Sequence, residues 1–466
     1  MVTQDATPGT YDFLTDLLDD EQLALEESVR EQFAADASPH EDHLPEVVVW
    51  PHTTAEVSAI LEAAHEREIP VTPWSGGTGV EGNAIPTEGG IVLNTYEMES
   101  ISVRPDDLQA VVGPGVVYDD LNEHLARYGL RFAPGISSGD AATIGGMIAT
   151  NASGINAVGY GETRDHVLRL EVVLPDGRTI ECGRDVIKTS AGYSLKDLFV
   201  GSEGTLGVVT GATLSLSGIP ERKRAALVTF PTPQEASSAV SEIIRFGLEP
   251  GAMEFIDKQS VELVNDYRGE EVFPVEPLLI IELHGNNSGI DEDVEFVKEI
   301  CEDNGANEWL SRSGEEMEDI WSARDDALSA SRAYRENYQP AFIGDVVVPI
   351  SKYPEIVEAV GRVADDVGVF TPMVGHAGDG NLHYLPIVDP DEEGAMERAN
   401  EVNERVVETA IGMGGTATGE HGVGIGKRKF MSTEHAEAVD VMADIKEAID
   451  PTGIMNPGKV LPDREG

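Results

Sequence analysis

The stretch PWSGGTGVEGN, residues 73–83, places four glycines in one loop, and it is preceded by apolar residues typical of a buried strand. Glycines allow consecutive backbone N–H groups to approach an anion without obstruction by side chains. The loop does not follow the G-x-G-x-x-G or G-x-x-x-x-G-K-[ST] patterns of the common nucleotide-binding folds. A turn with no ligand is the alternative, so the loop alone leaves both open.

Two further tracts rich in small residues support ligand binding. They are PGISSGDAATIGGMIATNASGINAVGYGETRDHV (134–167) and FVGSEGTLGVVT (199–210). So many Gly, Ala, Ser and Thr residues provide little side-chain volume for a core, but they allow the backbone to pass close to a large flat ligand. Glu203 in the third tract offers a carboxylate to a sugar hydroxyl or to a base edge.

Length and periodicity predict two domains. A chain of 466 residues is too long for one core. Residues 46–79 read as a strand, an amphipathic helix with Val57, Ile60, Leu61 and Ala64 on one face, and a second strand. After a polar joint at 218–227, strands and helices alternate with antiparallel spacing, which is typical of a separate α+β domain.

The charge is strongly acidic, with 85 Asp and Glu against 32 Lys and Arg and a formal net charge of −53. Such self-repulsion favours a salt-rich cytoplasm, and a positively charged partner is the alternative. Nucleic acid is not expected as a ligand, because no basic stripe is present. Without a signal segment or a spanning apolar run, we expect a cytoplasmic protein; peripheral contact with the inner face of the membrane is left open.

GHAGDGNLHY, residues 375–384, brings two histidines to either side of a sharp turn. One reading is structural: one histidine caps the turn and the other packs beside Tyr384. The other reading is a metal site, since zinc, manganese and iron(II) take imidazole ligands together with a carboxylate. Glu420 in GEHGVG is a candidate carboxylate. The two cysteines, Cys182 and Cys301, indicate neither a disulfide framework nor a Cys-rich metal site.

The three small-residue tracts, in this order and spacing, resemble the FAD-binding domain of the vanillyl-alcohol oxidase and p-cresol methylhydroxylase group. WSARDDALSASRAY, GDVVVPISKYPEI, GHAGDGNLHY, GTATGEHGVGIGKRKF and DPTGIMNPGKVLP extend the resemblance to cytochrome-type D-lactate dehydrogenases and glycolate oxidase FAD subunits, over 45–462. The resemblance implies an α+β fold with three parts: an acidic helical segment (1–44), an FAD-binding domain (45–221), and a substrate and metal domain (222–462) whose tail returns to the flavin.

The same resemblance implies bound FAD. The loop at 73–83 contains no histidine or cysteine and Cys182 lies outside the three tracts, so we expect the FAD to be non-covalent. The expected cofactor-binding residues are Ser75, Gly76, Gly77, Thr78, Gly79, Gly82, Gly135, Ser138, Thr143, Gly145, Gly146, Thr150, Asn151, Ser153, Gly154, Glu203, Gly204, Val208, Val209 and Asn456.

For the reaction, the resemblance implies that His376, His383 and Glu420 bind a divalent metal, with zinc expected and manganese or iron as alternatives. His421 is expected to act as the general base, or else to support the site. Arg324 is expected to grip the substrate carboxylate with both branches of its guanidinium. A plain ion pair with Asp325 or Asp326 is the alternative reading of Arg324.

The expected activity is FAD-dependent oxidation of a small D-2-hydroxy acid. The resemblance implies that relatives acting on D-2-hydroxyglutarate have a threonine and a lysine at the positions where this chain has Leu328 and Ile343. Without these polar partners for a second carboxylate, a short acid such as D-lactate is favoured. Glycolate and D-2-hydroxyglutarate are the alternative substrates. A metallohydrolase and a non-catalytic electron-transfer flavoprotein subunit are the alternative classes. The electron acceptor (quinone, cytochrome or electron-transfer flavoprotein) and a homodimer are left open.

Overall fold

The computed structural model describes residues 10–463, and these form two compact units. The first unit contains the chain up to Ser153, residues Glu162–Ile219, and the chain from Glu420 onward. The second unit contains Gly154–Gly161 and Pro220–Gly419. The first nine residues of the predicted N-terminal segment lie outside the described part of the chain.

One sheet of the first unit holds the strand–helix–strand predicted for 46–79. Strands β2 (Val47–Val49), β4 (Ile91–Asn94) and β3 (Val71–Trp74) are parallel, and β1 (Leu23–Ala24) adds antiparallel to β2. Helix α2 (Thr54–Arg67) begins at Thr53, whose side chain accepts a hydrogen bond from the Glu56 amide. The buried face of α2 is the predicted one: Val57, Ile60, Leu61 and Ala64.

The N-terminal segment is less helical than predicted. It consists of the short α1 (Glu27–Arg30), strand β1 and 3₁₀ turns at Asp12–Asp16, Asp20–Gln22 and Glu31–Phe33. Leu14 and Leu18 are buried in the core beneath the parallel sheet. Tertiary packing and pairing with β2 therefore outweigh local helix propensity here.

The second sheet of this unit is antiparallel, in the order β5 (Ile101–Arg104), β6 (Gln109–Val112), β10 (Val208–Ser215), β8 (Val167–Val173) and β9 (Thr179–Gly183). Strands β8 and β9 form the hairpin that the Pro-Asp-Gly sequence at 175–177 predicts, with Gly177 at φ +81° in its turn. Helices α3 (Tyr118–Ala126), α4 (Ile144–Thr150), α6 (Thr163–His166) and α7 (Lys196–Phe199), with strands β7 (Leu130–Arg131) and β11 (Ser217–Gly218), complete this part.

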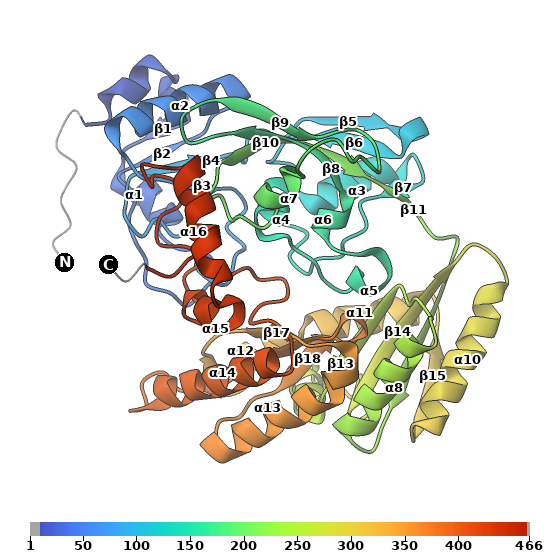
Figure 1. The fold of residues 1–466 in the computed structure, drawn as a ribbon. Helices are drawn as coiled ribbons and strands as arrows, with labels where there is room; N and C mark the ends of the chain where they lie inside the picture. Colours follow the sequence, from blue (N-terminus) through green and yellow to red (C-terminus); the bar gives the residue numbers. More distant parts are fainter. Residues whose placement is uncertain (1–9, 464–466) are drawn as a thin grey trace. The chain divides into compact units, whose positions relative to one another are not determined.

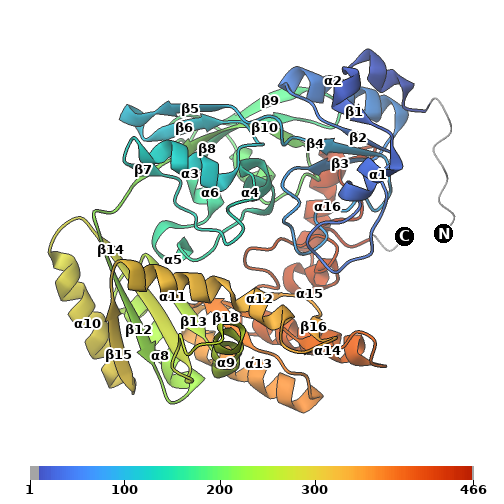
Figure 2. The same ribbon diagram turned by 180° about the vertical axis from the view of Figure 1, so that it is seen from behind.

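The C-terminal segment packs on the first sheet. Helices α15 (Met431–His435) and α16 (Ala438–Ile449) lead to a tail in which Met455 forms a parallel bridge with Val71 of β3. Figures 1 and 2 show α16 in red beside the blue strand β3. Ile454 and Met455 belong to the same buried cluster as Val71 and Leu93, so this segment is part of the core of the first unit.

A seven-stranded antiparallel sheet forms the second unit. Its strands, in spatial order, are β15 (Glu308–Arg312), β12 (Arg222–Thr229), β14 (Leu278–Gly285), β13 (Ala252–Ile256), β18 (Met373–His376), β19 (Asn381–Tyr384) and β17 (Gly344–Val347). A two-stranded ribbon of β16 (Gln339–Pro340) and β20 (Ile387–Val388) lies beside it. The β18–β19 connection is the predicted hairpin around the histidine pair.

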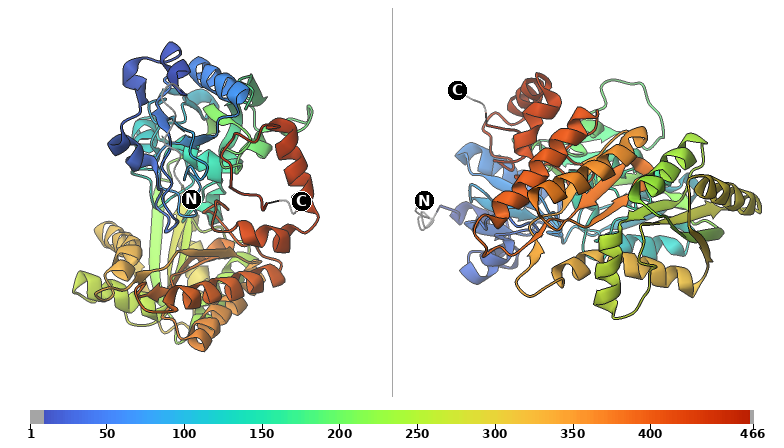
Figure 3. Two further views of the ribbon diagram at one scale, coloured as in Figure 1. Left: turned by 90° about the vertical axis from the view of Figure 1, so that its left-hand side faces the viewer. Right: turned by 90° about the horizontal axis from the view of Figure 1, so that it is seen from below.

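Helices cover both faces of this sheet. α8 (Pro233–Arg245), α10 (Gly289–Asp303), α13 (Tyr353–Val367) and α14 (Ala395–Gly412) contact one another and one face of the sheet. The right-hand view of Figure 3 shows α13 and α14 in orange, side by side. α9 (Lys258–Arg268), α11 (Glu315–Asp325) and α12 (Ala327–Arg332) pack on the other face, which Figure 2 presents to the viewer. The short α5 (Ala157–Tyr160) contacts β13.

Among the described residues, none of the helices combines the length and the apolar character needed to cross a membrane.

Candidate functional site

In the first unit the structure brings the first and second small-residue tracts together. The hydroxyl oxygens of Ser75 and Thr143 lie 2.5 Å apart. A Cβ on Gly76 would lie 2.4 Å from the carbonyl oxygen of Ala141, so only glycine allows this approach of two backbones. Thr143 also caps α4 by accepting a hydrogen bond from the Gly146 amide at 3.3 Å. We call this contact between the loop at 73–83 and the start of α4 the glycine cradle.

Glu203 of the third tract has a structural role that the sequence did not predict. Its carboxylate accepts hydrogen bonds from the amides of Val423 (2.7 Å) and Gly424 (2.9 Å) and from Asn83 Nδ2 (2.6 Å). Burial outweighs these bonds and raises the pKa of the Glu203 carboxyl. Both oxygens therefore hold the C-terminal segment, and the contact of Glu203 with a sugar or base stays a prediction.

Asn456 joins this arrangement from the tail. Its Nδ2 donates to the carbonyl oxygens of Glu203 (2.7 Å) and Asn83 (2.9 Å), while its Oδ1 is buried without a hydrogen-bond partner among the described residues. A buried acceptor of this kind requires a donor from a ligand or from water. Asn456 and the glycine cradle are thus two observations that fit a bound FAD in the first unit.

The remaining predicted cofactor residues have different surroundings in the structure. Asn151, Thr150 and Ser153 hydrogen-bond within the first unit, to Glu162 and Arg164, to the Gly146 carbonyl, and to Glu420 Oε2 respectively. The side chain of Val208 packs in the core beneath the parallel sheet, and a contact of Val208 with FAD stays a prediction. The structure places Gly135, Ser138, Gly145, Gly204 and Val209 in the first unit with Thr78, Gly79, Gly77 and Gly82, whereas Gly154 belongs to the second.

In the second unit, the hairpin sets the two imidazoles of His376 and His383 side by side. Their ring centroids are 5.2 Å apart, the planes are nearly perpendicular at 86°, and one ligand nitrogen of each lies within 4.8 Å of the other. Both side chains are buried. Two nitrogens that bind one ion at about 2.0–2.1 Å lie at most about 4.2 Å apart, so the two rings are close to the spacing of a shared ion site.

Each histidine has a carboxylate directly opposite it on the neighbouring strand. Glu254 of β13 pairs with His376, and Asp345 of β17 pairs with His383. Glu254 Oε1 lies 2.5 Å from His376 Nδ1. His383 Nδ1 lies 3.3 Å from the Gly344 carbonyl oxygen and 3.8 Å from Asp345 Oδ1. Acceptors at both Nδ1 atoms favour the tautomer in which Nε2 carries the lone pair for a metal.

Arg324 lies at the end of α11 and is almost fully buried. Its Nε and Nη2 donate to Glu254 Oε2 at 2.7 and 2.6 Å, and its Nη1 is 3.8 Å from Asp325 Oδ1. Burial alone would raise the pKa of the Glu254 carboxyl, but Arg324 and His376 outweigh it and the pKa is lowered. The main partner of Arg324 is therefore Glu254, rather than the Asp325 or Asp326 that the sequence suggested.

Glu420 and His421 directly follow Gly419, the last residue of the second unit, and they begin the final segment of the first. Gly419 is held by its amide, which donates to Asp345 Oδ2 at 2.8 Å, and Thr418 Oγ1 donates to the same oxygen at 3.0 Å. Consecutive Cα atoms are about 3.8 Å apart, so Asp345 fixes the residue that directly precedes Glu420 in the chain.

Glu254 and Asp345 are site residues that sequence reasoning did not identify. A buried carboxylate within an apolar strand, as in AMEFI and GDVV, is the signal that could have found them, since such residues are rare in cores unless they are paired.

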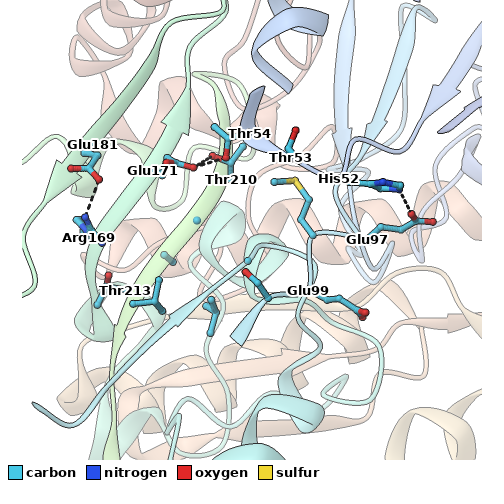
Figure 4. A pocket seen from close by; sticks show the side chains of 17 residues that line it. His52, Thr53, Thr54, Glu97, Glu99, Arg169, Glu171, Glu181, Thr210 and Thr213 are labelled. Carbon is cyan, nitrogen blue, oxygen red and sulfur yellow. Dashed lines mark hydrogen bonds and ion pairs between the residues drawn. The ribbon is translucent and has the colours of Figure 1, made fainter. Parts of the chain in front are cut away.

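One further cavity, of about 500 Å³, lies in the first unit, and none of its lining residues is a predicted site residue. Figure 4 shows some of its polar side chains paired with one another, His52 with Glu97 among them. Glu171 accepts from Thr54 (2.5 Å) and Thr210 (2.9 Å), and Arg169 pairs with Glu181 at 2.9 Å. We assign no ligand to this cavity.

Comparison with known proteins finds matches over most of the chain. Residues 45–183 match the family described as "FAD binding domain", and residues 219–460 match "FAD linked oxidases, C-terminal domain". The chain is 39% identical over 448 residues to "Probable D-lactate dehydrogenase, mitochondrial" of Danio rerio, covering 95% of this chain and 89% of that protein. It is 36% identical to "Glycolate oxidase subunit GlcD" of Bacillus subtilis, covering 92% of each.

Solved structures show the same fold at low identity. p-Cresol methylhydroxylase with substrate bound matches with a TM-score of 0.81 at 16% identity over 97% of each chain. Alkyldihydroxyacetonephosphate synthase matches with a TM-score of 0.77 at 21% identity, over 97% of this chain and 86% of the other. The expected α+β fold of the vanillyl-alcohol oxidase and p-cresol methylhydroxylase type is confirmed, and the chain belongs to the family of FAD-linked oxidases and dehydrogenases.

Proposed function

We propose that this enzyme oxidises a short D-2-hydroxy acid, with D-lactate as the first substrate to test and glycolate as the second. The observation that carries the proposal is a cluster in the second unit: the Glu254 carboxylate links buried Arg324 to His376, and His383 lies beside His376. An arginine fork suits a carboxylate, and two imidazoles suit a divalent ion. The names of the relatives in zebrafish and Bacillus support the same substrate class.

His376 and His383 would hold a divalent cation through Nε2, and Glu420 would add a carboxylate ligand. Zinc is the first ion to test, with manganese and iron(II) next, because all three accept this donor set. Bound there, such an ion supplies Lewis-acid chemistry toward the hydroxyl and carboxylate of a 2-hydroxy acid. Asp345 supports the assignment of Glu420 by fixing Gly419, the residue before it.

In the proposed reaction, Arg324 binds and orients the substrate carboxylate. His421 accepts the proton of the C2 hydroxyl, since an imidazole can exchange a proton near neutral pH. Non-covalent FAD, held by the cradle around Ser75, Gly76 and Thr143 with Asn456, supplies the two-electron acceptor that this oxidation requires. The hydrolase alternative is disfavoured by the match of residues 45–183 to an FAD-binding domain.

The decisive experiment is anaerobic bleaching of the flavin absorbance by a panel of D- and L-2-hydroxy acids in molar KCl. We expect D-lactate to bleach the flavin, L-lactate not to, and D-2-hydroxyglutarate to do so poorly because Leu328 and Ile343 are apolar. Full reduction by dithionite with no response to any 2-hydroxy acid would reject the proposal. Yellow colour that remains on acid-precipitated protein would reject the non-covalent assignment.

Two variants test the roles of single residues. Arg324→Lys keeps the charge but loses the fork, so we expect a raised KM for D-lactate with a smaller change in kcat. His421→Ala should lower kcat while metal content and FAD absorbance remain at the wild-type level. Unchanged KM in the first variant, or unchanged kcat in the second, would remove that assignment.

A further inference from the structure

We propose that Glu254 is a positioning residue that holds the substrate-binding arginine and a metal-binding histidine with one carboxylate. This inference rests on the proposed function, because it assigns Arg324 to the substrate and His376 to the metal. It adds a residue that lies on neither the metal nor the substrate, and whose loss should weaken the binding of both.

The geometry of Glu254 divides its two oxygens between two partners. Oε1 faces His376 Nδ1 at 2.5 Å, and Oε2 accepts from Arg324 Nε and Nη2 at 2.7 and 2.6 Å. The side chain is 0% exposed and lies on β13, next to β18 of the histidine hairpin. No water can replace either partner there without a cavity opening, so the carboxylate is committed to both.

Each contact fixes a property that the chemistry needs. An ionised carboxylate only accepts hydrogen bonds, so His376 must carry its proton on Nδ1 and present Nε2 as the ligand nitrogen. The side-on pair with Nε and Nη2 fixes the plane of the guanidinium. That orientation directs the Nη1 edge of Arg324 away from Glu254, and this is the edge we assign to the substrate carboxylate.

The two histidines are not supported equally. His383 Nδ1 has a longer contact, 3.3 Å to the Gly344 carbonyl oxygen, and its carboxylate neighbour Asp345 is 3.8 Å away. Asp345 is occupied by Asn381 Nδ2 at 2.6 Å and by the Gly419 amide at 2.8 Å. Glu254 therefore provides a short carboxylate contact to His376, and its removal should affect His376 more than His383.

Glutamine at position 254 keeps the size of the side chain but cannot serve both partners. If its oxygen accepts from Arg324, its NH₂ group faces His376 Nδ1 and favours the wrong tautomer for the metal. If its oxygen accepts from His376, the NH₂ group faces the guanidinium, which has only donors. Loss of such an indirect ligand contact typically lowers metal affinity about 10- to 100-fold.

Glu282 provides a matched control in the same sheet. It lies on β14 beside β13, and it is almost as buried as Glu254. Its carboxylate accepts from His284 Nε2 (2.5 Å), Lys223 Nζ (2.9 Å) and Trp321 Nε1 (2.9 Å). Glu282→Gln thus perturbs a buried carboxylate–histidine network and, through Trp321, the same helix α11, but its partners are neither Arg324 nor His376.

The test compares wild type, Glu254→Gln and Glu282→Gln as FAD-loaded full chains in molar KCl. Zinc affinity is measured by competition with a chromophoric chelator, and D-lactate affinity by the flavin absorbance change at saturating zinc. In Glu254→Gln we expect zinc affinity to fall about 10- to 100-fold. D-lactate affinity should fall at least about tenfold in the same variant, as for loss of a charge-assisted contact. In Glu282→Gln both affinities should stay within about twofold of wild type.

Several results would overturn the proposal. Wild-type affinities in Glu254→Gln would reject the coupling alone. If His383→Ala binds zinc as tightly as the wild type does, the metal site and the coupling are both rejected. Equal losses in the two glutamine variants would indicate a general structural effect and also reject it. If Glu254→Gln does not fold, Glu254→Asp replaces it: its shorter carboxylate reaches one partner only, so one of the two affinities must fall while the other is kept.

Discussion

Replacing Arg324 by methionine should destabilise the second unit by about 3–5 kcal/mol, the typical cost of removing one partner from a buried ion pair. The value is at the upper end of common point-mutant effects because Glu254 is 0% exposed and Arg324 only 7% exposed. Methionine occupies a similar volume, so a cavity adds little to this loss. For a domain of this size, each kcal/mol shifts Tm by about 2–4 °C, which gives a decrease of roughly 6–20 °C.

Differential scanning calorimetry in molar KCl at pH 7 would measure this shift in the transition of the second unit. Lys223→Met is the control: the lysine side chain is 40% exposed and Glu282 keeps His284 and Trp321 as partners, so the loss should be less than about 1 kcal/mol. A loss below about 1 kcal/mol in Arg324→Met would refute the view that Glu254 depends on Arg324 for its charge. A similar loss in the control would refute the assignment to burial.

Four further predictions concern stability, cofactor, metal and salt. Burial raises the pKa of Asp257 to about 6, so the folded state binds the proton more tightly than the unfolded state does. Stability should therefore fall as pH rises from about 4 through 6, by roughly 3 kcal/mol at most. The isosteric cap variant Asp257→Asn should lack this slope in pH-dependent urea denaturation. Gly76→Ala should lower the FAD content measured by absorbance, because the new Cβ would meet a backbone oxygen. The control Gly218→Ala has open space around its Cβ and should keep full FAD. Equal FAD content in the two variants would contradict the cradle. His383→Ala should lose bound metal by elemental analysis with FAD retained; a full metal complement would place the ion elsewhere. Raising KCl from 0.1 to 2 M should increase Tm because it screens a net charge of −53; a Tm independent of salt would reject adaptation to a salt-rich cytoplasm.

The sequence predicted those parts of the fold whose cause is local. The face of α2 follows from the helical spacing of Val57, Ile60, Leu61 and Ala64, and the β8–β9 hairpin follows from its Pro-Asp-Gly turn. The N-terminal segment was predicted less well. Its acidic helical pattern is overruled by the burial of Leu14 and by the pairing of β1 with β2.

The candidate site shows the same division. His376 and His383 are close in sequence around a glycine turn, so their approach could be predicted. The ion pair of Arg324 could not, because three residues on helices and strands compete for it and only the fold chooses Glu254 over Asp325 and Asp326. The role of Glu203 was likewise hidden, since its hydrogen-bond donors Val423 and Gly424 come from the other end of the chain.

By itself, the sequence indicated that backbone can come close to a large flat ligand, because glycine and other small residues permit that approach wherever the fold places them. It also determined that two imidazoles flank one turn. The tertiary structure alone decided which carboxylates stand behind those imidazoles: Glu254 is 122 residues from His376 in the chain and reaches it through the register of β13 with β18. Strand order and register are set by the packing of the whole sheet, and no local pattern encodes them.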